Sequence, residues 1–144
     1  MAFWLQKTIN LKARSQGCYL ITDEILEVIG PDLKLVQVGM CNIFLAHTSA
    51  GLTLMENFDP TVRGDMQRFF NKLVPEGKGL YEHDSEGPDD MPAHIKSALT
   101  GVSVNIPISN GQLMTGTWQG IWLMEYRTHK HNRKVVVTIN GQKK

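Results

Sequence analysis

The sequence predicts an α+β fold, a mostly antiparallel β-sandwich-like sheet with two or three packed helices. Apolar and polar residues alternate in several short segments, which is typical of strands with one buried face. Two other segments carry apolar residues at helical spacing. Parallel strand-helix-strand alternation does not persist, so we expect hairpin-like connections in the second half of the chain. The elements add up to about six to eight strands, in a single domain over residues 1–144.

The N-terminal part is predicted to contain two strands, a short helix and a longer strand region. The first strand is indicated by apolar residues that share one side, namely Phe3, Leu5, Ile9 and Leu11. Residues 18–21 form a short apolar segment. Thr22 is expected to cap a short helix that Gly30-Pro31 ends, since both residues disfavour a helix interior. Residues 35–46 are rich in Val, Ile, Leu and Phe, which predicts one or two strands deep in a sheet.

The clearest helix is predicted to begin at Asp59-Pro60, because Asp is a strong N-cap and Pro fits the first helical position. Pro75 and Gly77 end it. We expect its apolar face to pack on the sheet with Phe69 at the centre, so that Phe69→Ala costs about 3–5 kcal/mol. The residues of this face are Val62, Met66, Phe69, Phe70 and Leu73.

The second half begins with a long polar and acidic loop over residues 76–92. Apolar spacing over residues 91–99 predicts another helix, and Gly101 follows its end. Glycines at 116 and 120 predict a bend or bulge that divides one long alternating segment. The remaining strand segments are residues 104–108, with Pro107 favouring an edge position, residues 113–127 and residues 135–139.

The composition excludes several classes of protein. Fifteen Lys and Arg against fourteen Asp and Glu leave a net charge of +1, which gives no support to a general nucleic-acid or membrane-surface partner. The apolar runs are far shorter than the roughly 18 residues of a membrane span. The N-terminus does not read as a secretory signal. Cys18 and Cys41 form no Cys-x-x-Cys pair, so we expect reduced, structural thiols and a cytoplasmic location.

The first segment whose residue types suit catalysis or ligand binding is residues 47–53, His-Thr-Ser-Ala-Gly-Leu-Thr. It leaves a predicted buried strand through small, hydroxylated residues, whose N–H groups and hydroxyls can receive phosphate oxygens. On this interpretation Thr48 and Ser49 contact phosphate. The alternative is an ordinary turn in which the hydroxyls cap backbone groups. The segment lacks the Gly-x4-Gly-Lys-Ser/Thr pattern of a P-loop.

The second segment is residues 82–94, where five carboxylates and two histidines fall within thirteen residues. A solvated acidic loop with hydrogen-bonded histidines is one interpretation. The other adds His47 to His83 and His94, because three neutral imidazoles leave an open position on a Zn²⁺-like ion. Nearby carboxylates such as Asp84 would then orient the imidazoles.

The third segment is the predicted strand over residues 116–127. Period two places Thr117, Gln119, Glu125 and Arg127 on one face. Glu125 needs a partner if buried, and the alternatives are an exposed ion pair or a buried carboxylate that meets a histidine or a metal. His129 and His131 fall in a basic loop, which we interpret as solvated and able to attract an anionic substrate.

Together these segments resemble the YjbQ family of small proteins, often called secondary thiamine-phosphate synthases. The resemblance covers nearly the whole chain, apart from the loop 127–132. It implies a compact β-sandwich-like α+β subunit, a homotrimer, and a site near the histidines that holds a metal. The matching stretches are residues 47–53 with Glu56-Asn57, His83-Asp84 with residues 86–94, Gly111 with residues 116–120 and Glu125, and Arg133.

The resemblance also implies an activity, the joining of a pyrimidine diphosphate to a thiazole phosphate to give thiamine phosphate and pyrophosphate. In the family this activity is regarded as secondary. We therefore predict an enzyme of the transferase type that acts on small phosphorylated substrates with a divalent metal, zinc or magnesium. The alternatives are a metal-dependent hydrolase and a non-catalytic trimeric protein that binds a metal or metabolite. The expected roles are catalytic for His47, His83, Asp84, His94 and Glu125, metal-binding for His47, His83 and His94, and substrate-binding for Thr48, Ser49, Thr117, Gln119 and Arg127.

Overall fold

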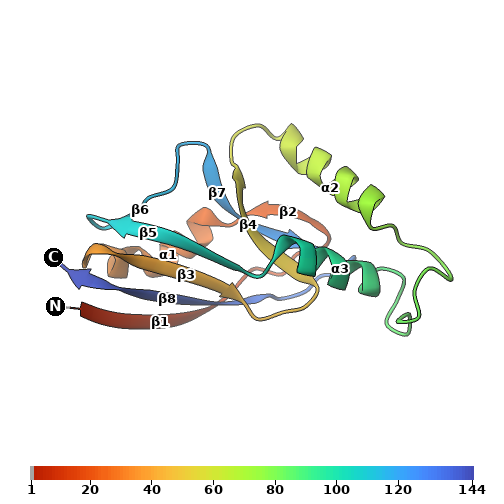
Figure 1. Cartoon of the computed structure of the whole chain (residues 1–144), viewed down its shortest axis with the longest axis horizontal. Helices are drawn as coiled ribbons and strands as arrows, with labels where there is room; N and C mark the ends of the chain where they lie inside the picture. The colour runs from red at the N-terminus through yellow and green to blue at the C-terminus, as the bar shows by residue number, and fades with distance from the viewer. Residues whose placement is uncertain (1) are drawn as a thin grey trace.

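Two antiparallel sheets and three helices make up residues 2–144, the part of the chain that the computed structural model describes (Figure 1). This arrangement confirms the predicted α+β class. One sheet has the strand order β1-β8-β3-β5-β6 and the other β2-β7-β4. In chain order the elements are β1 (Ala2–Asn10), β2 (Gly17–Leu20), α1 (Thr22–Leu33), β3 (Val36–Leu45), β4 (Ala50–Glu56), α2 (Thr61–Leu73), α3 (Asp90–Thr100), β5 (Ser103–Ser109), β6 (Gln112–Leu113), β7 (Gln119–Glu125) and β8 (Lys134–Lys143).

The main core lies between the five-stranded sheet and a layer made of the three-stranded sheet and α1. Successive side chains of a strand point to opposite faces, so alternate residues of β3 and β8 enter this core. Cys41, Ile43 and Val137 are fully buried there. From α1, Ile25 and Ile29 fill the same space. The alternation read from the sequence therefore identifies the inner face of the larger sheet.

Strand β7 is buried on both faces because it is the middle strand of the smaller sheet. Ile121 and Leu123 point into the main core, whereas Trp122 and Met124 point into a second, smaller core. Helices α2 and α3 lie over this second core (Figure 1). The predicted bend at residues 116–120 is confirmed, since β6 and β7 are separate strands in different sheets.

Helix α1 is longer than the sequence predicted, because it continues through Gly30-Pro31 to Leu33. Proline removes one helical hydrogen bond to the carbonyl four residues back, here that of Glu27. Glu27 is exposed, so water can satisfy that carbonyl. Burial of Leu33 holds the last turn in place. The predicted cap was also wrong, since the Thr22 hydroxyl accepts the Ile121 N–H at 2.9 Å instead of capping the helix.

Helix α2 lies where the sequence predicted it, and its start is supported by Asp59, whose carboxylate accepts the Thr61 N–H at 3.0 Å. Its packing differs from the prediction. Phe69 is 59% exposed and Leu73 is 55% exposed, so Phe69 is not the centre of a packed face. Only one side of the apolar stripe, through Met66 and Phe70, contacts the smaller core.

Helix α3 confirms the predicted helix at residues 91–99 and ends at Gly101, whose φ of 91° suits glycine. Strand β5 confirms the alternating segment at residues 104–108, with Pro107 next to the two-residue strand β6 near the sheet edge. No helix within residues 2–144 is both long and apolar enough to cross a bilayer.

Candidate metal centre

Three side chains converge at the N-terminal end of α3. Asp90 and His94 lie one turn apart on the same face of this helix, and His83 reaches them from the preceding loop. Asp90 Oδ2 lies 2.8 Å from His83 Nε2 and 3.2 Å from His94 Nε2. All three donor atoms lie within 4.8 Å of one another, with Asp90 only 1% exposed. The cluster therefore offers two imidazole nitrogens and one carboxylate oxygen around a common point.

The segment 47–53 docks α3 onto strand β4. The Ser97 hydroxyl donates to the Ala50 carbonyl at 2.7 Å, and the Leu52 N–H donates to the Gly101 carbonyl at 3.0 Å. Glycine is required at position 51, because a Cβ there would lie 2.7 Å from the Thr100 side chain. The small residues of this segment thus permit close packing of a helix, and that packing places His94 beside Thr48.

The position of the proton on His94 follows from its neighbours. His94 Nδ1 lies 2.7 Å from the Thr48 carbonyl oxygen, and a carbonyl can only accept, so Nδ1 carries a proton and donates it. In the neutral ring, Nε2 then presents a lone pair. The Nε2 atom lies 3.2 Å from Oδ2 of Asp90, and this carboxylate oxygen is also an acceptor. The contact is favourable only if a cation lies between the two atoms or a second proton sits on His94.

Asp90 is held in its ionised form. Arg127 donates from Nη1 to Asp90 Oδ1 at 2.9 Å and from Nε to Asp89 Oδ2 at 2.8 Å. Although burial opposes ionisation, the hydrogen bond with His83 and the charge of Arg127 hold the pKa of Asp90 below its ordinary value. In the same way, the Thr128 N–H and Arg127 outweigh burial and lower the pKa of Asp89. The N-terminus of α3 adds a further favourable partial charge.

The donor set fits a divalent ion such as zinc. A backbone carbonyl that fixes Nδ1–H is the usual outer partner of a metal-binding histidine, and it leaves Nε2 free to bind. Donors about 3.3 Å apart surround a tetrahedral zinc ion at bonds of about 2.0 Å. The distances of 2.8 and 3.2 Å from Asp90 to the two imidazoles are close to that value. Three protein ligands leave at least one coordination position open.

His47 lies near this cluster but in a different hydrogen-bonding state. Its Nε2 accepts the backbone N–H of Lys134 at 2.8 Å. Burial and the charge of Arg133 lower the pKa of His47, with a partial opposing effect from Glu125. The neutral ring therefore carries its proton on Nδ1. His47 and His94 line one open groove of about 520 Å³, together with Thr48, Ser97, Ala98, Gly101 and Val102.

Glu125 and Ser49 belong to a buried network beneath this groove. Arg133 binds Glu125 through two hydrogen bonds of 2.6 Å, and Glu125 also accepts the Arg127 N–H at 3.1 Å. The Ser49 hydroxyl accepts from Arg133 at 2.9 Å. Both side chains are almost fully buried, whereas Thr48 is exposed at the groove. Arg133 was not among the predicted site residues, although it stands in the matched motifs.

Two predicted substrate-binding residues lie at the opposite end of the smaller sheet. Gln119 pairs with Glu56 at one end of β7, whereas Glu125 pairs with Ala50 at the other. Six residues of strand span about 20 Å. Thr117 lies beyond Gln119, and the Asn57 side chain donates to its carbonyl at 3.3 Å. Within one chain, Thr117 and Gln119 therefore do not join the histidine cluster.

The carboxylate at the cluster is that of Asp90 and not that of Asp84, which was predicted from the sequence. Asp84 is exposed, and its side chain makes none of the hydrogen bonds identified within residues 2–144. Asp90 takes that place because it is the first residue of α3 and stands four positions before His94. This i, i+4 spacing was the available signal. Arg127 also differs from the prediction, since all three hydrogen bonds identified for its side chain go to the loop and to α3, including one to the Glu86 carbonyl at 2.9 Å.

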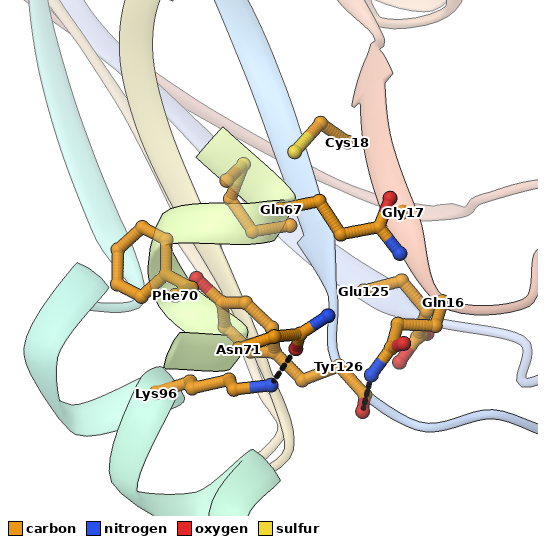
Figure 2. A pocket seen from close by; sticks show the side chains of 10 residues that line it. Gln16, Gly17, Cys18, Gln67, Phe70, Asn71, Lys96, Glu125 and Tyr126 are labelled. Carbon is orange, nitrogen blue, oxygen red and sulfur yellow. Dashed lines mark hydrogen bonds between the residues drawn. The ribbon is translucent and has the colours of Figure 1, made fainter. Parts of the chain in front are cut away.

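A second buried polar cluster lies beneath α2 (Figure 2). Lys96 is 1% exposed, donates to Asn71 Oδ1 at 2.6 Å and lies 5.6 Å from the centre of the Tyr126 ring. Burial lowers the pKa of Lys96. The adjoining cavity of about 10 Å³, bordered by Gln67 and Phe70, is the size of one water molecule. This cluster joins α2 to α3 and has no room for a larger ligand.

The fold and the centre together define a small α+β sandwich protein with a candidate metal site of two histidines and one aspartate. The chain belongs to the YjbQ family, since the family model described as "UPF0047 protein YjbQ-like" matches residues 7–142. It is 52% identical to the UPF0047 protein YjbQ of Escherichia coli O157:H7 over 139 residues, which covers 96% of this chain and 99% of that relative. The UPF0047 protein YjbQ of Salmonella typhimurium matches with the same identity and coverage.

Solved structures support the same assignment. A YjbQ/UPF0047 family protein from Clostridium acetobutylicum is 36% identical with a TM-score of 0.77, covering 94% of this chain and 98% of that one. A YbjQ-like protein of unknown function from Sulfolobus solfataricus has a TM-score of 0.86 at 22% identity, covering 99% of this chain and 100% of that one. At this identity the second similarity establishes the fold alone.

Proposed function

We propose that the chain is a divalent-metal-dependent enzyme that acts on small phosphorylated substrates. The observation that carries the proposal is the convergence of His83 Nε2, His94 Nε2 and the ionised carboxylate of Asp90. Because His94 Nδ1 donates to the Thr48 carbonyl, the neutral ring turns its Nε2 lone pair toward that carboxylate. A cation between these atoms turns an unfavourable contact into a favourable one. A bound divalent ion would supply Lewis acidity toward a phosphate or diphosphate oxygen.

The side chains of the protein have distinct parts in this proposal. His83, His94 and Asp90 hold the ion. Arg127 is a positioning residue, because it keeps Asp90 ionised and fixes the loop that carries His83 to α3. Glu125 has a supporting part as well, since it neutralises Arg133 beneath the groove. Thr48 is exposed at the groove and is the hydroxyl available to a substrate oxygen.

The reaction that the family resemblance implies is the transfer of a pyrimidine group from its diphosphate to a thiazole phosphate, with release of pyrophosphate. The metal position is suited to the charge that develops on the departing pyrophosphate. The test is pyrophosphate release by the wild-type protein, loaded with zinc or with magnesium, in the presence of both substrates. Asp90→Asn is the matched variant, since it keeps the volume of the side chain and removes its charge.

The alternatives predict different outcomes of the same assay. Metal-dependent release of phosphate or pyrophosphate without the thiazole substrate would indicate a hydrolase. Tight binding of metal and substrate without turnover would indicate a non-catalytic binding protein and contradict the enzyme proposal. Turnover that is unchanged in Asp90→Asn would contradict the role of the centre.

We also propose that the chain forms a homotrimer through the outer face of its five-stranded sheet. On this face, the residues paired across the strands with Ala2, Trp4, Gln6 and Thr8 of β1 form four rows, and none of these rows contains a charged residue. Near a symmetry axis equivalent residues meet each other, so a charged side chain there would face its own copy. The exposed apolar residues of this face are Trp4, Val38, Met40 and Phe44.

A cytoplasmic location is the last part of the proposal. Cys18 and Cys41 are both free and buried. Burial raises the pKa of the Cys41 thiol to about 11, which keeps it protonated and unreactive near neutral pH. Fractionation of cells that express the protein is the direct test, and recovery in the medium or an envelope fraction would contradict the proposal.

A further inference from the structure

The proton on His47 has a fixed place that the proposed metal centre does not use. The Lys134 N–H can only donate, so the Nε2 atom of His47, 2.8 Å away, must accept and cannot carry a proton. If Nδ1 were to bind a metal, both ring nitrogens would have to be unprotonated, which requires an imidazolate. His47 is therefore a poor metal ligand in this arrangement, although the sequence pattern grouped it with His83 and His94.

The same restriction makes His47 a well-positioned donor. Its Nδ1–H makes no hydrogen bond to a protein acceptor among those identified within residues 2–144. The ring lines the groove that His94 also lines, so a molecule in the groove can contact both. Ser49 does not line the groove, and the Ser97 hydroxyl already donates to the Ala50 carbonyl. Among the lining residues this leaves the His47 Nδ1–H and the Thr48 hydroxyl as the unpaired side-chain donors.

The charges around the groove suit an anion once a metal is present. The three buried carboxylates Asp89, Asp90 and Glu125 are paired with Arg127 and Arg133. Two arginines and a divalent cation outweigh three carboxylates. A neutral N–H donor beside such a centre can bind an anionic oxygen without a desolvated charge of its own.

We propose that His47 is a substrate-binding residue that donates its Nδ1–H to an oxygen of a phosphate or diphosphate group in the groove. The proposal rests on the proposed function, because it places the same anion beside the His83, Asp90 and His94 centre. It differs from the sequence prediction in removing His47 from the metal ligands. The ligand class is a phosphate monoester or diphosphate, and inorganic pyrophosphate is the simplest probe.

Two substitutions distinguish the role of Nδ1 as a donor from the role of Nε2 as an acceptor in the His47 ring. His47→Asn places an amide nitrogen at the same number of bonds from Cβ as Nδ1, so it keeps the donor and loses the acceptor for Lys134. His47→Gln places an amide oxygen at the same number of bonds as Nε2, so it keeps the acceptor for Lys134 and has no donor at the position of Nδ1. Zinc affinity and pyrophosphate affinity of the zinc-loaded protein are measured by calorimetry for both variants and the wild type.

We expect both variants to bind zinc as the wild type does. Pyrophosphate affinity should fall about 10- to 100-fold in His47→Gln, which is the loss of one hydrogen bond to a charged group, and much less in His47→Asn. Loss of zinc in His47→Gln would make His47 a ligand and overturn the inference. Unchanged pyrophosphate affinity in His47→Gln, or an equal loss in both variants, would overturn it as well. Absence of zinc binding in the wild type would instead contradict the proposed function.

A measurement without substitution covers the case in which a variant does not fold. Two-bond ¹H–¹⁵N correlation spectra of the ¹⁵N-labelled, zinc-loaded protein report which ring nitrogen of His47 carries the proton. We expect the proton on Nδ1, with a change in that nitrogen's chemical shift when pyrophosphate is added. A proton on Nε2, or no change with saturating pyrophosphate, would contradict the proposal.

Discussion

At the scale of single residues, Asp90 and Glu125 have opposite roles although both are buried carboxylates beside an arginine. Asp90 uses one oxygen for Arg127 and turns the other toward two imidazoles. Both oxygens of Glu125 are occupied by Arg133. The first arrangement has capacity for a cation and the second has none. Function should therefore depend on Asp90 and folding on Glu125.

Matched substitutions test this difference. Asp90→Asn should lower zinc affinity by more than the roughly 10–100-fold that loss of an outer partner costs. Glu125→Gln should leave zinc affinity unchanged and lower the free energy of unfolding by about 3 kcal/mol, since Arg133 would remain buried without its partner charge. Zinc titration and urea unfolding of both proteins are the measurements. A loss of zinc binding in Glu125→Gln with normal stability would contradict the assignment.

The two cysteines give a second prediction at this scale. Burial is the main cause that raises the pKa of both thiols, that of Cys41 to about 11. The neutral form of each thiol is therefore favoured in the folded protein, and the stability it contributes is lost only as pH rises above the ordinary pKa of about 9. At pH 8 we expect no alkylation of the native protein by iodoacetamide and two modified cysteines after unfolding in urea. Rapid labelling of Cys41 in the native protein would show that β3 opens readily.

At the scale of elements, helices α1 and α2 differ in how their apolar residues are used. Ile29 on α1 is fully buried, whereas Phe69 on α2 is 59% exposed. Ile29→Ala should cost about 2–5 kcal/mol. Phe69→Ala should change the free energy of unfolding by no more than about 0.5 kcal/mol, which replaces the value expected from the sequence. The free energy of unfolding of both variants is measured in urea. Equal losses in the two variants would mean that the exposed face of α2 is covered in solution.

Some strands and helices could be located from the sequence, whereas the packing of others could not. Period-two alternation identified β1 and β5, because one side of each of these strands packs on the main core. Helical spacing located α2 and α3. The same spacing could not tell how much of the apolar face of α2 is covered, because that depends on the width of the three-stranded sheet beneath it. The predicted end of α1 at Gly30-Pro31 was wrong for a similar reason, since the burial of Leu33 outweighs the local cost of proline.

The candidate site was predictable to a similar degree. The motifs identified His83 and His94, which the structure brings together. They did not separate these from His47, whose proton is fixed by a backbone group in a distant strand, Lys134 of β8. They also grouped Thr117 and Gln119 with the histidines, although β7 holds the two groups at opposite ends. Proximity across strands and the direction of hydrogen bonds are tertiary properties.

At the scale of the whole molecule, the uncharged outer face of the larger sheet predicts the mode of assembly. Light scattering should give about three times the chain mass of 16.2 kDa. Met40→Lys, in the middle of this face, should lower that mass toward the monomer, because equivalent lysines would meet near the axis. Phe69→Lys is the control, since it adds the same charge at an exposed apolar position on α2. A monomeric wild type, or dissociation only in Phe69→Lys, would contradict the proposed face.

Anomalous X-ray scattering from crystals grown with zinc tests the metal centre formed by His83, Asp90 and His94. We predict one strong peak per chain, about 2.0 Å from His83 Nε2, His94 Nε2 and Asp90 Oδ2. His94 Nδ1 should still donate to the Thr48 carbonyl, and His47 should still accept the Lys134 N–H. Crystals that contain zinc without a peak at these three atoms, or with a peak bound to His47, would contradict the account.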